Sequence, residues 1–179
     1  MLHDITKSLF EGIQVWPGDV DFVKKTVEDQ GFFTSSVVMS LHTGTHMDAP
    51  AHRFPQGKTI DEFRPFILTS YLGKSPFVKG SAVLFRGPVT GETAKALAEA
   101  EVALVGTDSS SIDIDGSVQA HEVLLGNGIP VIENLDLSQI EPGKYLLLAF
   151  PVKISGADAS PVRIILADSL EDIIPADWK

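Results

Sequence analysis

Residues 42–54 read His-Thr-Gly-Thr-His-Met-Asp-Ala-Pro-Ala-His-Arg-Phe, which places three histidines and one aspartate in a single short stretch. The whole chain has five histidines and no cysteine, so most of its imidazoles are gathered here. Neutral imidazole and carboxylate are ligands that Zn, Mn and Fe accept readily. The stretch therefore predicts a metal site built from nitrogen and oxygen ligands.

The spacing of His42, His46 and Asp48 predicts a bend in the backbone. In a straight strand the three side chains would share a face, but His42 and His46 would lie roughly 13 Å apart at about 3.3 Å per residue. That separation is too large for one ion whose ligand bonds are about 2 Å. A helix is disfavoured by Gly44 and Pro50. Because glycine adopts unusual backbone angles, we expect the chain to turn at Gly44, so that the three ligands converge and Asp48 can bridge two ions.

Composition limits the class of protein. A length of 179 residues with 44% hydrophobic content predicts one globular domain over residues 1–179. The net charge of -10 argues against a nucleic-acid or anionic-membrane partner, because both are bound through a surplus of lysine and arginine. The absence of cysteine, of a long apolar run and of a signal-like N-terminus favours a cytoplasmic protein that acts on small molecules.

The order of apolar runs and breakers predicts an α/β fold with a mixed β-sheet and two or three helices. Thr90 and Ser117 are the expected N-caps of two helices, over 90–100 and 117–125. Strands are expected on both sides of these helices, and the segment from 59 to 79 shows no clean period. The expected strands are 2–13, 21–28, 32–41, 81–85, 102–105, 130–133, 145–154 and 162–167, with 21–28 and 32–41 forming a hairpin whose second strand delivers the histidines.

A complete metal site needs further ligands, and the residues alone leave these open. His121 lies inside the second expected helix, and Glu133 ends an apolar strand. Both are plausible ligands, but His121 would equally suit a solvated helix surface beside Glu122, and Glu133 a strand end. The pair Asp113 and Asp115 is similar to a calcium loop but lacks its full ligand series, so it is set aside.

Residues 42–52 resemble the signature of the metal-dependent cyclase family, whose best understood branch is bacterial kynurenine formamidase. The resemblance extends over nearly the whole chain. In this family a downstream His and Glu twelve positions apart complete the metal site, and His121 and Glu133 have that spacing. The further matching segments are 16–19 (Trp-Pro-Gly-Asp), 57–61 (Gly-Lys-Thr-Ile-Asp), 107–108 (Thr-Asp), 153–158 (Lys-Ile-Ser-Gly-Ala-Asp) and 160–161 (Ser-Pro).

The resemblance implies a swivelling β/β/α-type fold, usually a homodimer or homotetramer, with two divalent ions, Zn or Mn. It implies the following roles: His42, His46 and Asp48 hold one ion, His121 and Glu133 with Asp48 hold the second, and His52 is the catalytic acid/base. Two such ions lower the pKa of water and polarise a carbonyl, and the ordinary pKa of histidine suits a proton shuttle. Asp108, at a strand end, is expected to orient a ligand histidine.

The implied activity is hydrolysis of the amide bond of a small aryl formamide such as N-formylkynurenine. Trp16, beside a turn, and Phe54 are the expected walls for the aromatic substrate, and Arg53 and Lys58 are candidates to meet a substrate carboxylate. Two features depart from the family pattern: Arg53 displaces the aromatic that follows the third motif histidine, and the chain is short. The alternatives are a sibling activity that opens a lactam such as isatin, or a metal-binding accessory protein without turnover.

Overall fold

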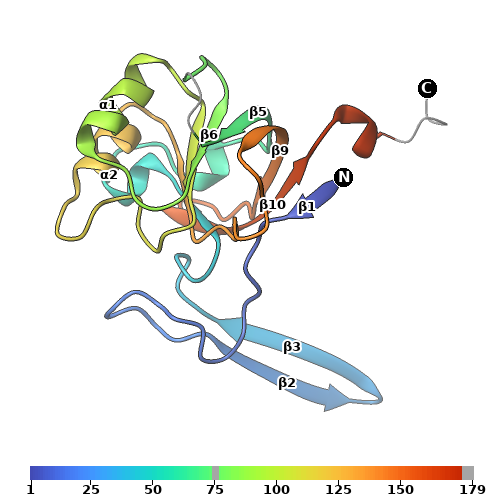
Figure 1. Ribbon diagram of the computed structural model, residues 1–179. Helices are drawn as coiled ribbons and strands as arrows, with labels where there is room; N and C mark the ends of the chain where they lie inside the picture. Colours follow the sequence, from blue (N-terminus) through green and yellow to red (C-terminus); the bar gives the residue numbers. More distant parts are fainter. Residues whose placement is uncertain (74–76, 175–179) are drawn as a thin grey trace.

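A computed structural model describes residues 1–73 and 77–174 of the chain. Its main feature is a sheet of eight strands in the order β1-β10-β4-β8-β7-β6-β5-β9. Because β9 also pairs with β10, the sheet curls into a barrel (Figure 1). The strands are β1 (Leu2–Asp4), β4 (His46–Asp48), β5 (Phe66–Leu72), β6 (Ala82–Phe85), β7 (Leu104–Thr107), β8 (Val131–Glu133), β9 (Gly143–Pro151) and β10 (Ala159–Ala167).

The sheet is mixed, as the sequence predicted. β5, β6, β7 and β8 run parallel to one another, whereas every pairing that involves β1, β4, β9 or β10 is antiparallel. The carboxyl ends of β7 and β8 therefore lie at the same edge, where α/β proteins commonly bind ligands. Glu133 is the last residue of β8 and stands at this edge.

Two α-helices, α1 (Gly91–Glu99) and α2 (Gln119–Gly126), cover the outer face of the parallel strands (Figure 1). Leu97 and Leu124 are fully buried between the helices and strands β6, β7 and β8, and burying one such side chain stabilises the fold by roughly 1.5–3 kcal/mol. A second apolar core, which includes Met47 and Leu147, fills the barrel. None of the helices in the described part of the chain is both long and apolar enough to cross a membrane.

The predicted caps have different outcomes. Thr90 is the N-cap of α1, and its hydroxyl accepts a hydrogen bond from the backbone of Thr93. Val118, not Ser117, occupies the N-cap position of α2, but Ser117 Oγ accepts a hydrogen bond of 3.2 Å from the N–H of Gln119. Asp113 Oδ1 accepts another from the N–H of Ala120 in the first turn. The carboxylate that caps α2 thus comes from outside the expected helix.

Two segments of the chain differ from the expected pattern of strands. The strand expected over 2–13 is only β1, because the chain leaves the sheet after Asp4. The segment from 59 to 79, which shows no period, contains β5, whose two faces are both partly buried and so give no alternation. Three short 3-10 helices complete the described elements: η1 (Pro50–His52), η2 (Ile60–Glu62) and η3 (Leu170–Asp172).

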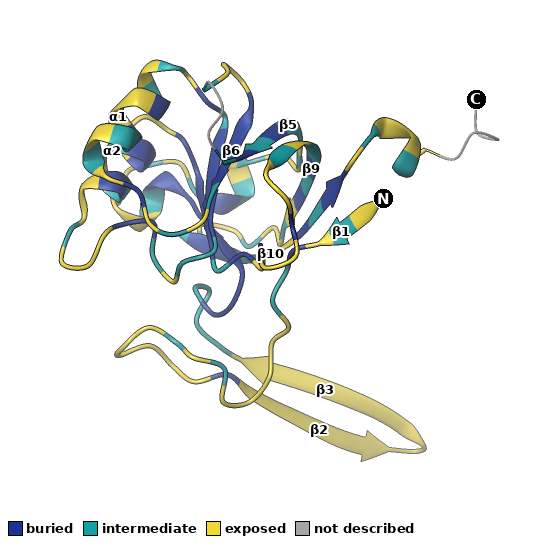
Figure 2. Cartoon of the chain, in the orientation of Figure 1, coloured by how far each residue is buried: buried dark blue, intermediate teal, exposed yellow. Residues whose placement is uncertain are grey.

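Strands β2 (Val23–Asp29) and β3 (Phe32–Val38) form the predicted hairpin, which is a separate sheet of two strands. Every residue of both strands is exposed, and the hairpin extends away from the barrel (Figures 1 and 2). The expectation that β3 delivers the histidines directly is wrong, because β3 ends at Val38 and a turn segment separates it from β4. Phe32 and Phe33, at the tip, are 77% and 73% exposed.

Candidate metal centre

The predicted bend occurs at Gly44, whose φ angle is +66°. It places the ring centroids of His42 and His46 only 5.0 Å apart, which a straight strand would not allow. After the bend β4 enters the barrel between β8 and β10, so that His46 pairs with Glu133 and Asp48 pairs with Ala159. The pairing explains why residues distant in sequence meet at one site.

Asp48 lies at the centre of the cluster and is almost fully buried. Its Oδ1 atom lies 2.9 Å from His42 Nδ1 and 3.4 Å from His46 Nε2. Its Oδ2 atom lies 3.5 Å from His121 Nε2. The two oxygens therefore face different groups of nitrogen ligands.

His121 and Glu133 complete the cluster from α2 and β8. His121 Nε2 lies 3.3 Å from Glu133 Oε1, and Glu133 Oε2 lies 3.6 Å from His46 Nε2. The backbone N–H of Ile112 donates a hydrogen bond of 2.6 Å to Glu133 Oε1, which fixes the carboxylate. All five residues that the sequence assigned to the metal thus lie together.

Hydrogen bonds donated by Nδ1 orient two of the imidazoles. His46 Nδ1 donates to the carbonyl oxygen of Gly44 at 2.9 Å, and His121 Nδ1 donates to Asp113 Oδ2 at 2.6 Å. Both rings therefore turn Nε2 towards Asp48, and partners of this kind commonly fix metal-binding histidines. The expectation for Asp108 is not met, because its carboxylate accepts from the N–H of Gly87. The sequence analysis considered Asp113 only as part of an incomplete calcium loop and missed its contact with His121, for which the sequence gives no signal except a separation of eight residues.

The polar atoms at the centre of the cluster fit a cation. Among the described residues, His46 Nε2, both carboxylate oxygens of Asp48 and His121 Nε2 are buried without a hydrogen-bond partner. Buried polar atoms are rarely left unpaired, and nitrogen and carboxylate oxygen atoms are suitable ligands for divalent ions. Two sets of atoms have the spacing of a metal site: His42, Asp48 and His52, and His46, Asp48 and Glu133.

The same proximity shifts the pKa values. Burial disfavours the charged form of His42, but the carboxylates of Asp48 and Asp158 outweigh it and raise the pKa of His42 to about 9. Burial likewise opposes the charge of His121, and Asp48 and Glu133 raise its pKa to about 11. Burial also opposes the charge of Asp48, but the neighbouring imidazoles hold its pKa well below the ordinary value. The cluster therefore favours positive charge at its centre, which protons or a cation can supply.

His52 ends the 3-10 helix η1 and lies at the edge of the cluster. Its ring centroid is 4.3 Å from that of His42 and 5.8 Å from that of His121. His52 Nδ1 lies 3.1 Å from Asp158 Oδ2, and its side chain is more exposed than those of the other site histidines. This histidine is the one that solvent reaches most easily.

Comparison with known proteins agrees with this arrangement. A family model described as "Putative cyclase" matches residues 3–74. Kynurenine formamidase of Salinibacter ruber is 33% identical in an alignment that covers 94% of this chain and 98% of that protein. The chain belongs to the cyclase family. Kynurenine formamidase of Paracidovorax citrulli is 32% identical, with 93% of this chain and 96% of that protein covered.

Solved structures have the same fold as this cyclase. A predicted metal-dependent hydrolase from Bacillus stearothermophilus has a TM-score of 0.80 at 24% identity, covering 94% of this chain and 98% of that one. Isatin hydrolase A from Ralstonia solanacearum has a TM-score of 0.80 at 19% identity, covering 93% of this chain and 91% of that one. The predicted family and fold are thus confirmed, and the chain is a metal-dependent amidohydrolase similar to arylformamidases.

A cavity of about 600 Å³ opens onto the cluster of histidines and carboxylates in the cyclase. One wall is the segment 14–19, which includes Trp16, and another is the start of α2. Arg53 also lines the cavity and forms an ion pair with Glu122. Phe54 is not among the lining residues, because its ring lies beside Gly126 at the end of α2. Lys58 lies 3.9 Å from the ring centroid of Phe63 and also does not line the cavity.

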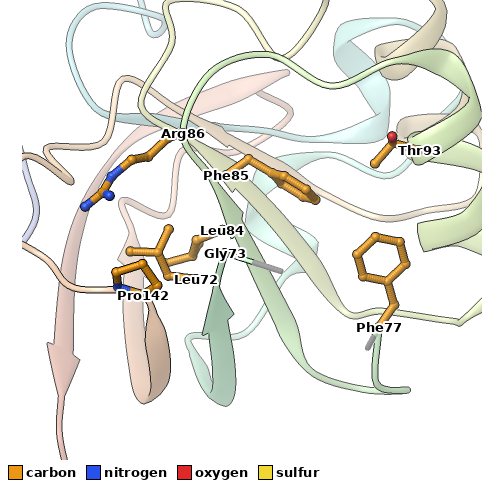
Figure 3. Close-up of a pocket in the computed structure, with 8 residues that line it drawn as sticks. All are labelled: Leu72, Gly73, Phe77, Leu84, Phe85, Arg86, Thr93 and Pro142. Atoms are coloured by element: carbon orange, nitrogen blue, oxygen red, sulfur yellow. The ribbon is translucent and has the colours of Figure 1, made fainter. Parts of the chain in front are cut away.

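A second hollow, of about 690 Å³, lies at the carboxyl ends of β5 and β6 (Figure 3). Its described lining is mostly apolar and includes Leu72, Phe77, Phe85 and Pro142. Arg86 also lines it, but the guanidinium donates hydrogen bonds to the carbonyl oxygens of Leu137 and Ile140. The described lining offers no carboxylate or imidazole, whereas the first cavity is lined by both.

Proposed function

We propose that this cyclase hydrolyses the C–N bond of a small aryl formamide, and that N-formylkynurenine is the substrate to test first. The observation that carries the proposal is the position of Asp48, whose two oxygens face separate ligand groups beside a cavity large enough for an aromatic substrate. The relatives named kynurenine formamidase support the choice of substrate.

The proposed ligands divide around Asp48. His42, His46 and Asp48 would hold one ion, and His121 and Glu133 together with Asp48 would hold the other, the ions being Zn or Mn. The distances from each oxygen to these nitrogens support the division. When bound, the cations supply Lewis acidity, which lowers the pKa of water and polarises a carbonyl.

His52 is the proposed acid/base. It takes one proton from the attacking water and returns it to the leaving nitrogen, so that formamide and water become an arylamine and formic acid. Its ring lies within reach of both the ligand cluster and solvent. Such assistance typically contributes about 10² to 10⁴ in rate.

Trp16 is the proposed wall for the aromatic ring of the substrate. Its side chain lines the cavity and is 58% exposed, so that it is free to contact a ligand. Arg53 lies on the same cavity and is a candidate to meet a substrate carboxylate, in exchange for its ion pair with Glu122. Phe54 does not line this cavity, so it has no place in the proposal.

Metal analysis of the purified protein, followed by assays on N-formylkynurenine and on isatin, tests the proposed function. We expect two equivalents of metal and release of formate from N-formylkynurenine. Turnover of isatin but not of N-formylkynurenine would mean that the substrate is a lactam. Two equivalents of metal without turnover of either compound would favour an accessory protein.

We further propose that the cyclase is a homodimer or homotetramer assembled through the β2–β3 hairpin. A hairpin of two strands is marginal in water by itself, and this one exposes apolar side chains on both faces, among them Val27, Phe33 and Val38. A second copy would bury them. We expect Phe33→Ser to lower the mass measured by light scattering, whereas Thr34→Ser leaves it unchanged; a wild-type monomer would contradict the proposal.

A further inference from the structure

The carboxylate of Asp158 joins the proposed acid/base to one of the proposed metal ligands. Asp158 Oδ2 lies 3.1 Å from His52 Nδ1 and 3.0 Å from His42 Nε2. The two ring centroids are 4.3 Å apart and the planes are tilted by 44°, so that a single oxygen meets both. The sequence comparison included this aspartate only as the end of a matching segment.

The barrel fixes the position of Asp158. It immediately precedes β10, and the register of β10 with β4 pairs the next residue, Ala159, with Asp48. The carbonyl oxygen of Asp158 accepts a hydrogen bond of 2.8 Å from the N–H of Ala49, and Asp61 Oδ1 accepts one of 3.0 Å from Gly156. The backbone at Asp158 is therefore held by strand pairing on one side and by hydrogen bonds of its own carbonyl and of Gly156, and it is not part of a free loop.

We propose that Asp158 is a positioning residue that holds the proton of His52 on Nδ1 and leaves Nε2 to exchange protons with water and the leaving nitrogen. This inference rests on the proposed function. A carboxylate only accepts hydrogen bonds, so the imidazole nitrogen that faces it carries the proton. Once Nε2 has taken a proton, the imidazolium stands beside a negative charge, which strengthens the hydrogen bond.

The same oxygen orients His42. Because His42 Nε2 donates to Asp158, Nδ1 is the nitrogen that faces Asp48, at 2.9 Å from Oδ1. Partners of this kind typically change metal affinity about 10- to 100-fold when removed. Asp158 thus acts on both the metal ligand and the acid/base through one atom.

The first test records long-range ¹H–¹⁵N correlations of the imidazoles, with and without zinc, at about pH 8. We expect His52 to carry its proton on Nδ1 in the wild-type protein, and we expect Asp158→Ala to remove this preference. Asp158→Asn keeps the shape and an acceptor oxygen, so it provides a second variant if the alanine variant folds poorly. A wild-type proton on Nε2, or identical spectra for wild type and Asp158→Ala, would overturn the proposal.

The second test combines zinc titration with kinetics at saturating zinc. We expect Asp158→Ala to raise the Kd for zinc about 10- to 100-fold and to lower kcat more than it changes KM. In a His52→Ala background the same substitution should cost no further kcat, because residues that act as a unit are not additive. An equal loss in both backgrounds would show that Asp158 does not act through His52.

Asp168→Ala is the matched control. Asp168 also bonds a histidine, since its Oδ1 lies 2.8 Å from His3 Nε2, but it lies beyond the other end of β10. This variant should keep the wild-type spectrum of His52, zinc affinity and kcat. If the wild-type protein turned over no formamide, the proposed function would fail, while the ring spectra and zinc affinity would still decide the role of Asp158.

Discussion

Asp113 binds His121 and α2 with the two oxygens of one carboxylate: Oδ2 accepts from His121 Nδ1 at 2.6 Å, and Oδ1 accepts from the N–H of Ala120 at 2.6 Å. The start of the helix and the direction of the imidazole are therefore fixed together. Because the ring is already ordered, metal binding by His121 loses less conformational entropy.

Replacing Asp113 by alanine should weaken the site and the fold together. We expect zinc affinity to fall by about 10- to 100-fold and stability to fall by about 1 kcal/mol through loss of the cap. A chelator competition assay and thermal unfolding measure the two effects. Asp115→Ala is the control, because Asp115 is exposed; unchanged zinc affinity in Asp113→Ala would refute the orienting role.

Asp48→Asn tests the bridge between the two ions. An amide has one carbonyl oxygen and one NH₂ group, so it cannot offer two anionic oxygens. We expect both ions to be lost together in elemental analysis, whereas Asp136→Asn, on the surface, should retain both. Loss of a single ion would mean that the two sites are independent.

His52→Ala separates proton transfer from metal binding. Turnover should fall by about 10² to 10⁴, as expected for the loss of a general acid/base, with the metal content unchanged. Atoms of His52, His42 and Asp48 lie close enough together to bind one ion. The metal content of the variant therefore decides whether His52 is a ligand. A metal-free variant would make His52 a ligand.

Metal binding should release protons and become tighter as pH rises. The metal-free pKa values of His42 and His121, about 9 and about 11, are raised above the ordinary value, so both rings hold a proton at neutral pH. A metal binds only the neutral ring, so protons compete with it for each histidine. This competition first becomes weaker at His42, as the pH approaches 9. Calorimetry in buffers of different ionisation enthalpy measures the protons released, and zinc binding without proton release would contradict these pKa values.

Gly44→Ala should destabilise the protein and disturb the site. The φ angle of +66° disfavours a side chain, and an added Cβ would lie 2.6 Å from Leu9 Cδ2. Strain of this kind costs on the order of 1–3 kcal/mol, measurable by urea unfolding. Gly116→Ala has a similar positive φ angle but open space around it, so it isolates the contribution of the clash with Leu9.

The sequence predicted the site best where it depends on residues that are close together along the chain. The distance argument for His42 and His46 required a bend, and glycine indicated its place. His121 and Glu133 could not be assigned from their own surroundings. The pairing of β4 with β8 brings Glu133 to the site, and the packing of α2 on the sheet brings His121; the family resemblance supplied them instead.

Other features depend on contacts that no local pattern records. Asp158 reaches His52 across 106 positions of sequence through the register of β10. The two strand-like runs at 21–28 and 32–41 predicted a hairpin correctly, but they did not indicate that the apolar side chains stay exposed. Phe54 does not line the cavity, and its ring lies beside Gly126 at the end of α2, a long-range contact that the sequence does not record.

The two parts of the cavity are built on different supports. The barrel strands β4 and β8 carry His46, Asp48 and Glu133. The cavity wall at 14–19, in contrast, belongs to the segment that leads out to the hairpin. Insertions or exchanges in that segment would leave every strand register of the barrel intact. Substrate range in this protein can therefore diverge quickly over evolutionary time while the hydrolytic chemistry is inherited unchanged.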